Sequence, residues 1–230
     1  MLKMIRTAAV LSVATAMIAG CAGNQPSAPA AQPAPVVEQA AKHSGTGFYD
    51  ALRPAESALL VPQPESLAAA YGQATATIEA EVIGVRPGRP IHDLQQIVVE
   101  LKPTQVLRGA LRPELKGRVE VEFPVAFVPE PIAPIVEKMK ADMPEGRGVW
   151  LLRWQGAPPP AAKPRAVKSS ALDPAFYSVV HPNCGVFVEN EGGVESVAAQ
   201  HEGGEEPIAA QAEGQRFGKL KDLVAHARKK

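Results

Sequence analysis

Prolines are the feature that most constrains what this chain can fold into, because 23 of them are spread over its 230 residues. A proline inside a helix removes a backbone hydrogen bond, and its ring clashes with the preceding turn. That number is too high for a mainly helical protein. The chain must therefore bury its apolar residues mostly on strands.

Alternation of apolar and polar residues predicts three consecutive strands after residue 75. A spacing of two places every second side chain on the same face, as in a half-buried strand. The apolar faces are Ala76, Ile78, Ala80 and Val82 in the first strand; Ile97, Val99 and Leu101 in the second; and Val119, Val121 and Phe123 in the third. The glutamates between them, Glu120 and Glu122 among them, are expected to face solvent.

Later segments continue the sheet. Residues 148–152 are apolar on both faces, which predicts a central strand. Another strand is expected to begin at residues 176–180. Residues 186–189 and 194–197 are expected to pair as a hairpin across Asn190-Glu191-Gly192-Gly193.

The N-terminus has the pattern of an export signal. Lys3 and Arg6 precede an uncharged segment over residues 7–18, which spans roughly 18 Å as a helix, short of the ~30 Å core of a bilayer. The following Ile18-Ala19-Gly20-Cys21 resembles the lipobox of bacterial lipoproteins, in which a peptidase cuts before the cysteine. The resemblance implies that Cys21 carries a lipid. An ordinary signal peptide cut elsewhere is the alternative.

Composition and periodicity divide the chain into six segments. An alanine- and proline-rich stretch such as residues 22–42 cannot bury enough apolar area to offset the entropy of ordering it. The expected segments are a signal peptide at 1–20, a lipid-anchored linker at 21–42, an irregular segment with a short helix at 43–71, a β-barrel domain at 72–200, an acidic glycine-rich loop at 201–215 and an amphipathic helix at 216–230.

Short motifs in residues 72–200 resemble small bacterial extracytoplasmic domains. The motifs are Val106-Leu107-Arg108-Gly109, Gly148-Val149-Trp150-Leu151-Leu152 and Gly185-Val186-Phe187. Their order is similar to that of OB-like barrels of the tissue-inhibitor and netrin-module superfamily. The resemblance implies a mainly β fold, a five- to six-stranded OB-like barrel or curled antiparallel sheet with a C-terminal helix, and little about activity.

Charge and cysteine content narrow the function classes. The chain has 24 basic and 24 acidic residues, so no basic excess indicates nucleic acid as a partner. Once Cys21 is modified, only Cys184 remains. The domain then has no internal disulfide, and its core must hold it together unaided.

His181 and Cys184 form the one chemically rich cluster. A histidine and a cysteine three residues apart could begin a metal site or pair as base and nucleophile. The other candidate ligands, His92, His201 and His226, have no motif spacing, so we expect neither a metal nor a cofactor. The alternative is a tight turn in which Cys184 packs as a small apolar residue.

Trp150 and Trp154 lie on one face if their strand is regular. OB-type sheets present side chains of this kind to ligands, so both tryptophans, with His181 and Cys184, are candidates for a ligand surface. The alternative is that they are core residues. The acidic run over residues 202–206 lacks the regular spacing of a calcium loop and is expected to be solvated.

Together these features predict a non-enzymatic cell-envelope lipoprotein. A lipid on Cys21 would anchor it outside the cytoplasm, on the outer membrane facing the periplasm if the host is Gram-negative. Its partners are then the membrane and other envelope proteins, which the β domain would bind or help to assemble. The alternatives are a small-molecule or peptide binding module, and an enzyme using Cys184 and His181.

Overall fold

The computed structural model describes residues 46–52, 63–91, 94–113, 117–125, 131–157, 173–196 and 208–229. All of them belong to one compact unit, residues 41–230. The expected signal peptide and linker, the acidic run at 202–206 and Cys21 lie outside the described residues, so the predictions for them remain predictions.

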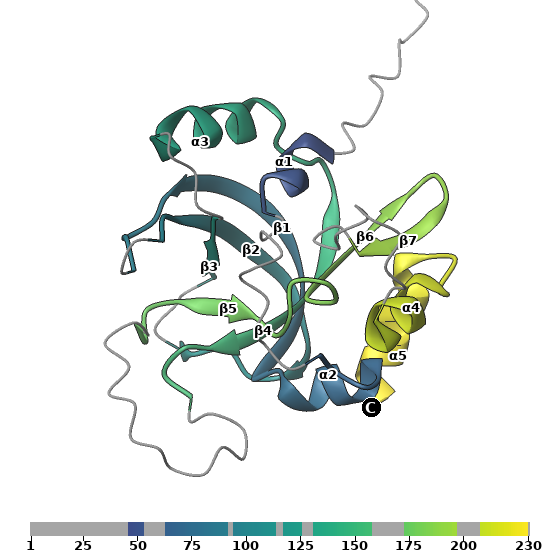
Figure 1. Ribbon diagram of the computed structural model, residues 1–230. Helices are drawn as coiled ribbons and strands as arrows, with labels where there is room; N and C mark the ends of the chain where they lie inside the picture. Colours follow the sequence, from purple (N-terminus) through teal and green to yellow (C-terminus); the bar gives the residue numbers. More distant parts are fainter. Residues whose placement is uncertain are drawn as a thin grey trace, which may run out of the picture. The chain divides into compact units, whose positions relative to one another are not determined.

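Five strands close into a barrel (Figure 1). In spatial order these are β1 (Ala76–Pro87), β2 (Gln96–Gly109), β3 (Val119–Pro124), β5 (Tyr177–Val179) and β4 (Arg147–Trp154), and β1 pairs again with β4 to complete the ring. Neighbours are antiparallel except β3 and β5, which run parallel. The predicted mainly β fold with an OB-like barrel is confirmed.

Two more strands extend the sheet from β4. β6 (Val186–Asn190) pairs with β4 and with β7 (Gly193–Ser196). Residues 189 and 190 lie opposite 194 and 193, so the hairpin predicted across residues 190–193 is confirmed. Gly193 has a φ of 124°, a value that a residue without a Cβ adopts readily.

The first strand bends to serve two neighbours. β1 pairs with β2 along its whole length, and residues 76–81 also pair with β4. Its register with β2 shifts at three places, between residues 77 and 78, 79 and 80, and 82 and 84. Such irregularities bend a strand and increase its twist, which allows this short sheet to close.

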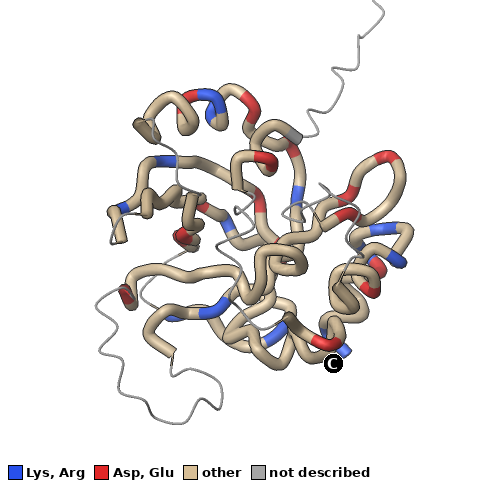
Figure 2. Tube along the Cα trace, in the orientation of Figure 1, with Lys and Arg blue, Asp and Glu red and all other residues tan. Residues whose placement is uncertain are grey.

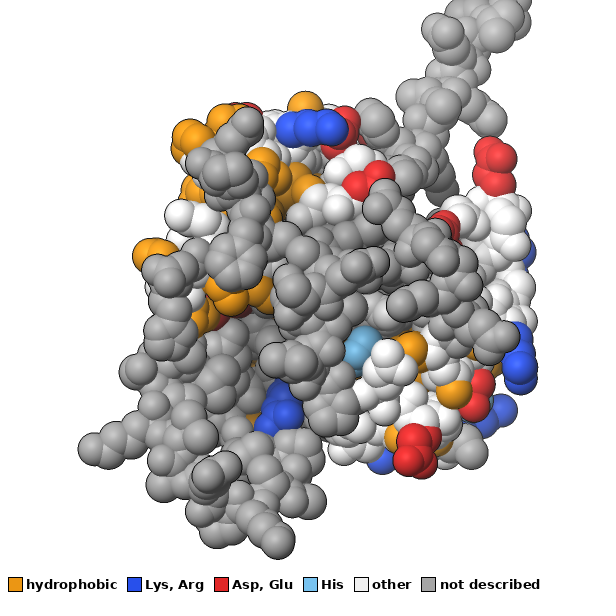
Figure 3. Space-filling view, in the orientation of Figure 1, with side chains coloured by type: hydrophobic (Ala, Val, Ile, Leu, Met, Phe, Trp, Pro, Cys, Tyr) orange, Lys and Arg blue, Asp and Glu red, His pale blue; other side chains and the backbone are white. Residues whose placement is uncertain are grey.

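Two helices pack at one end of the barrel. α1 (Thr46–Asp50) and α3 (Ile132–Ala141) contribute Phe48, Val136 and Met139 to the core inside the strands. Hydrophobic side chains gather over α3 in Figure 3, where Ile132 and Ile135 remain partly exposed. The described part of residues 43–71 contains α1 and the start of a second helix, α2 (Leu67–Gln73), where one helix was expected.

Three helices cover the outside of β4, β6 and β7 (Figure 1): α2, α4 (Ala209–Gln215) and α5 (Leu220–Lys229). α5 buries Leu220, Leu223, Val224 and Ala227, so the predicted C-terminal amphipathic helix is confirmed. The prediction of a loop over all of 201–215 is wrong for 209–215. In α4, Gly214 lies against the ring of Phe187, where an added Cβ would come within 2.2 Å of a ring carbon, so the missing side chain allows the helix to pack closely on β6.

β4 separates two apolar cores, as its two apolar faces predicted. Trp150 and Leu152 point into the barrel, and Val149 and Leu151 point toward the outer helices. All four are 0% exposed. No helix within the described part of the chain is long and apolar enough to span a membrane.

Candidate functional site

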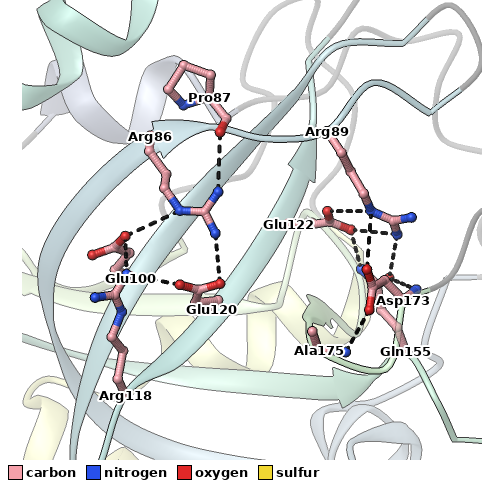
Figure 4. A network of polar contacts seen from close by, with 10 residues as sticks. All are labelled: Arg86, Pro87, Arg89, Glu100, Arg118, Glu120, Glu122, Gln155, Asp173 and Ala175. Carbon is pink, nitrogen blue, oxygen red and sulfur yellow. Dashed lines mark hydrogen bonds and ion pairs between the residues drawn. The ribbon is translucent and has the colours of Figure 1, made fainter.

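The outer face of β1, β2 and β3 carries a network of arginines and carboxylates (Figure 4). Glu100 and Glu120 lie directly opposite each other on β2 and β3, an arrangement of like charges that is unfavourable by itself. Arg86 bridges them, with its Nη2 2.8 Å from Glu120 and its Nε 3.4 Å from Glu100. Arg118 also contacts both, at 2.9 Å from Glu120. Two guanidinium groups therefore neutralise the pair.

Glu122 occupies a more enclosed part of the same face. Its side chain is only 2% exposed, and it accepts hydrogen bonds from Arg89 at 3.0 and 3.3 Å and from the Gln155 amide at 2.9 Å. The expectation that Glu122 faces solvent is wrong, although its strand face is as predicted. The hydrogen bond to Glu122 raises the pKa of the Arg89 guanidinium above its ordinary value, against the opposing effect of burial.

Two loops complete this network. Arg89 follows β1, Gln155 follows β4, and Asp173 precedes β5. The Gln155 side-chain oxygen accepts a hydrogen bond from the Asp173 backbone N–H at 2.9 Å. Residues of the β1–β2 connection and of the β4–β5 connection therefore meet over Glu122 of β3. The hydrogen bond between Gln155 and Asp173 also joins the start of the β4–β5 connection to its end.

Arginines also stack on the aromatic rings of this region. Arg86 and Arg89 lie 5.9 and 5.8 Å from the centre of the Phe176 ring, and Arg112 lies 4.5 Å from the Trp154 ring. These distances fall within the range of cation–π attraction. At least one guanidinium group therefore lies over each of the two rings.

The two predicted tryptophans have different surroundings. Trp150 is 0% exposed inside the barrel, with its ring edge-on to Phe123 at 6.4 Å, which corresponds to the core interpretation. Trp154 is half-buried at the end of the strand, and its Nε1 donates to the carbonyl of Pro174 at 2.8 Å. Of the two, Trp154 is the one that a ligand can reach.

His181 and Cys184 lie in the turn between β5 and β6, and both are buried. The Asn183 N–H donates to His181 Nδ1 at 3.1 Å, and the Cys184 N–H donates to the His181 carbonyl at 3.2 Å. Burial raises the pKa of the Cys184 thiol to about 12, so the thiol keeps its proton at neutral pH. These contacts are those of a tight turn with a packed cysteine.

Clusters of metal-binding side chains are not found among the described residues, where no group of three or more histidine, cysteine, aspartate or glutamate side chains could hold an ion. His181 and Cys184 therefore have no further ligand of these types beside them in the part of the chain that the structure describes.

A pocket of about 230 Å³ lies between the outer helices, and the sequence analysis missed it. It is lined by Leu67, Glu213, Arg216, Phe217 and His226. Because residues 201–215 were interpreted as a loop, nothing predicted that α4 would bring Glu213 beside α2. The sequence did contain a signal for the polar network on β3. The alternation places Glu120 and Glu122 on one face, and the segment at residues 86–90 supplies two arginines, Arg86 and Arg89, that could pair with them.

Comparison of the chain with protein-family models, with curated proteins and with solved structures finds no match. The fold and its surfaces define a small mixed β-barrel domain of five strands, extended by a two-stranded hairpin and covered on one side by C-terminal helices.

Proposed function

We propose that this chain is a lipid-anchored domain of the bacterial cell envelope that binds a partner protein and catalyses no reaction. The binding surface is the outer face of β1, β2 and β3. One observation carries the proposal: Arg89 of the β1–β2 connection and Gln155 and Asp173 of the β4–β5 connection are joined by hydrogen bonds to Glu122 of β3 or to one another. This group lies on the same face as the contacts of Arg86 and Arg118 with Glu100 and Glu120 (Figure 4). OB-like barrels bind their ligands at this face and with these two loops.

The charge of the face favours a protein over a polyanion. Three arginines face four carboxylates in the network, and Figure 2 shows blue and red residues interspersed along the chain. A nucleic-acid surface needs a basic excess. Arginine and aromatic side chains are enriched at protein interfaces. Here guanidinium groups lie over the rings of Phe176 and Trp154, which leaves less ring surface for stacking on a sugar.

The anchor is supported by the resemblance of Ile18-Ala19-Gly20-Cys21 to a lipobox. A diacylated cysteine holds a protein at a membrane, whereas a single acyl chain binds only marginally. The linker at 21–42 then holds the barrel away from the bilayer, on the periplasmic side of the outer membrane in a Gram-negative host. The likeness of the motif order to netrin-module barrels fits a binding role outside the cytoplasm.

The enzyme hypothesis is the less supported alternative. A nucleophilic cysteine acts as a thiolate, and the buried Cys184 thiol has a pKa of about 12. A role in packing accounts for its position between apolar residues of the outer core.

The anchor is tested by replacing each of the two cysteines in turn. Cys21→Ser is expected to abolish incorporation of a labelled fatty acid and to release the protein from the membrane fraction, because serine has no thiol to accept the lipid. Cys184→Ala is the matched control and is expected to keep the label. Membrane association of Cys21→Ser equal to that of the wild type, with unchanged processing, would refute the lipoprotein hypothesis.

The binding face is tested by placing a photo-crosslinking amino acid at one position in the full chain, in intact cells. Arg118 is suitable because its side chain is 50% exposed at the edge of the network. Lys221 is an exposed control position on α5. A discrete protein adduct from position 118 and none from position 221 is expected. No adduct, or the same adduct from both positions, contradicts the proposed face.

A further inference from the structure

The pocket between α2, α4 and α5 has walls of two kinds. Leu67 and Phe217 supply apolar surface, and Glu213, Arg216 and His226 supply polar groups. The three helices lie on the outside of the sheet (Figure 1), apart from the arginine-rich face of β1, β2 and β3. The pocket is therefore a second surface, whose lining residues differ from those of the proposed binding face.

The carboxylate in this pocket has a structural role. Glu213 Oε2 accepts a hydrogen bond of 2.8 Å from the backbone N–H of Leu67, the first residue of α2. Its contact ties α4 to α2 and uses one oxygen of the side chain. The Arg216 side chain, by contrast, has no ion-pair or hydrogen-bond partner among the described residues. An exposed guanidinium without a carboxylate is left beside the pocket.

His226 lies between two aromatic rings. Its imidazole is 5.2 Å from the ring of Phe217 and 5.9 Å from the ring of Tyr71. His226 Nδ1 and the Tyr71 hydroxyl are both buried, and neither has a hydrogen-bond partner within the described part of the chain. Buried polar atoms in folded proteins are nearly always hydrogen-bonded. Two such atoms on neighbouring rings, one of them on a residue lining the pocket, indicate a position where a bound group supplies the missing contact.

We propose that this pocket binds a carboxylate attached to a small apolar group. The planar guanidinium of Arg216 matches a carboxylate with two parallel hydrogen bonds. His226 Nδ1 adds a third polar contact, and Leu67 and Phe217 enclose the apolar part of the ligand. A pocket of about 230 Å³ is below the roughly 300 Å³ at which sites for drug-sized ligands begin, so the ligand is small or is the end of a peptide.

The test uses the full chain and four probes. 3-Phenylpropionate provides the carboxylate and the apolar group, and 3-phenylpropionamide is its neutral counterpart. A pentapeptide ending in phenylalanine, with a free or an amidated C-terminus, presents the same chemistry as a chain end. Binding is measured by calorimetry and by the rise in melting temperature that a ligand of the folded state produces.

Three variants identify the groups that bind. Arg216→Gln and His226→Phe are expected to weaken the binding of the carboxylate probes at least tenfold, since the first removes the guanidinium and the second keeps a ring between Tyr71 and Phe217 but removes Nδ1. Arg228→Gln, on an exposed position of α5 outside the pocket, is the matched control and is expected to bind as the wild type does.

The relative affinities of the four probes distinguish two kinds of carboxylate ligand. Tighter binding of 3-phenylpropionate than of the peptide identifies a free small acid, and the reverse identifies a C-terminal carboxylate; both support the proposal. Equal binding of the acid and amide forms, no binding of either carboxylate, or unchanged affinity in Arg216→Gln would overturn it. None of these results bears on the lipid anchor or on the crosslinking at position 118.

Discussion

Replacing Glu122 by alanine is expected to destabilise the domain by about 3 kcal/mol, whereas Glu120→Ala costs about 1 kcal/mol or less. The two glutamates lie two residues apart on the same face of β3, and each lies between two apolar residues in the sequence. Only their tertiary surroundings differ, so the pair tests the polar network directly.

The difference in magnitude comes from burial. Glu122 is 2% exposed and accepts from Arg89 and from Gln155, which is itself only 8% exposed. Its removal leaves the buried Gln155 amide without an acceptor, which costs about 1–3 kcal/mol, and breaking a buried ion pair costs about 3–5 kcal/mol in total. Arg89 remains 30% exposed and regains water, so the lower limit applies. Glu120 is 23% exposed, and solvent-screened pairs contribute only about 0.2–1 kcal/mol.

Urea unfolding at pH 7, followed by tryptophan fluorescence, measures the free energy of unfolding of the wild type, Glu120→Ala and Glu122→Ala. An unchanged dependence of this free energy on urea concentration shows that the three values are comparable. Glu122→Gln is the matched control because it keeps the volume and one acceptor oxygen, and an intermediate loss is expected. Equal losses in Glu120→Ala and Glu122→Ala, or a loss below about 1 kcal/mol in Glu122→Ala, would refute the argument from burial.

Four further predictions concern other parts of the chain. Val121→Ala, at a fully buried position, should cost about 2–3 kcal/mol by denaturant unfolding, from two lost methyl groups plus a cavity; a neutral result would mean that the barrel repacks. In a Cys21→Ser background, Cys184 should react with a thiol reagent only after unfolding, and rapid reaction of the folded domain would contradict its burial. Deletion of residues 22–42 should leave the melting temperature unchanged, because this composition offers no apolar face to dock; a fall of several degrees would contradict this. A hydrogen bond from the first N–H of α5 lowers the pKa of Glu189 from its ordinary value. Its contribution to stability is therefore present above the pKa of the unfolded state and is lost as the pH falls through the lower pKa of the folded state; acid titrations of Glu189→Gln should lack this loss.

Local sequence pattern determined the elements and their faces. The alternation over β1, β2 and β3 identified most of the residues that line the barrel there, because a strand places successive side chains on opposite faces whatever it pairs with. It missed Val85, which lines the barrel beyond the register shift between residues 82 and 84 of β1. The apolar run at residues 148–152 located the strand between two cores, and the turn residues at 190–193 located the hairpin. The C-terminal helix followed from its apolar spacing. These features depend on residues close together in the chain.

Tertiary structure alone decided which elements meet and which polar groups are buried. The parallel contact of β3 with β5 and the closure of β1 on β4 join segments far apart in the sequence, as does the packing of Gly214 of α4 on Phe187 of β6. Glu122 is buried because Arg89 and Gln155, each 33 residues away, converge on it. The pocket exists because α4 and α5 lie against α2. Burial is a property of all neighbours in space, so a pattern of period two specifies the face of a side chain and leaves its exposure to the rest of the fold.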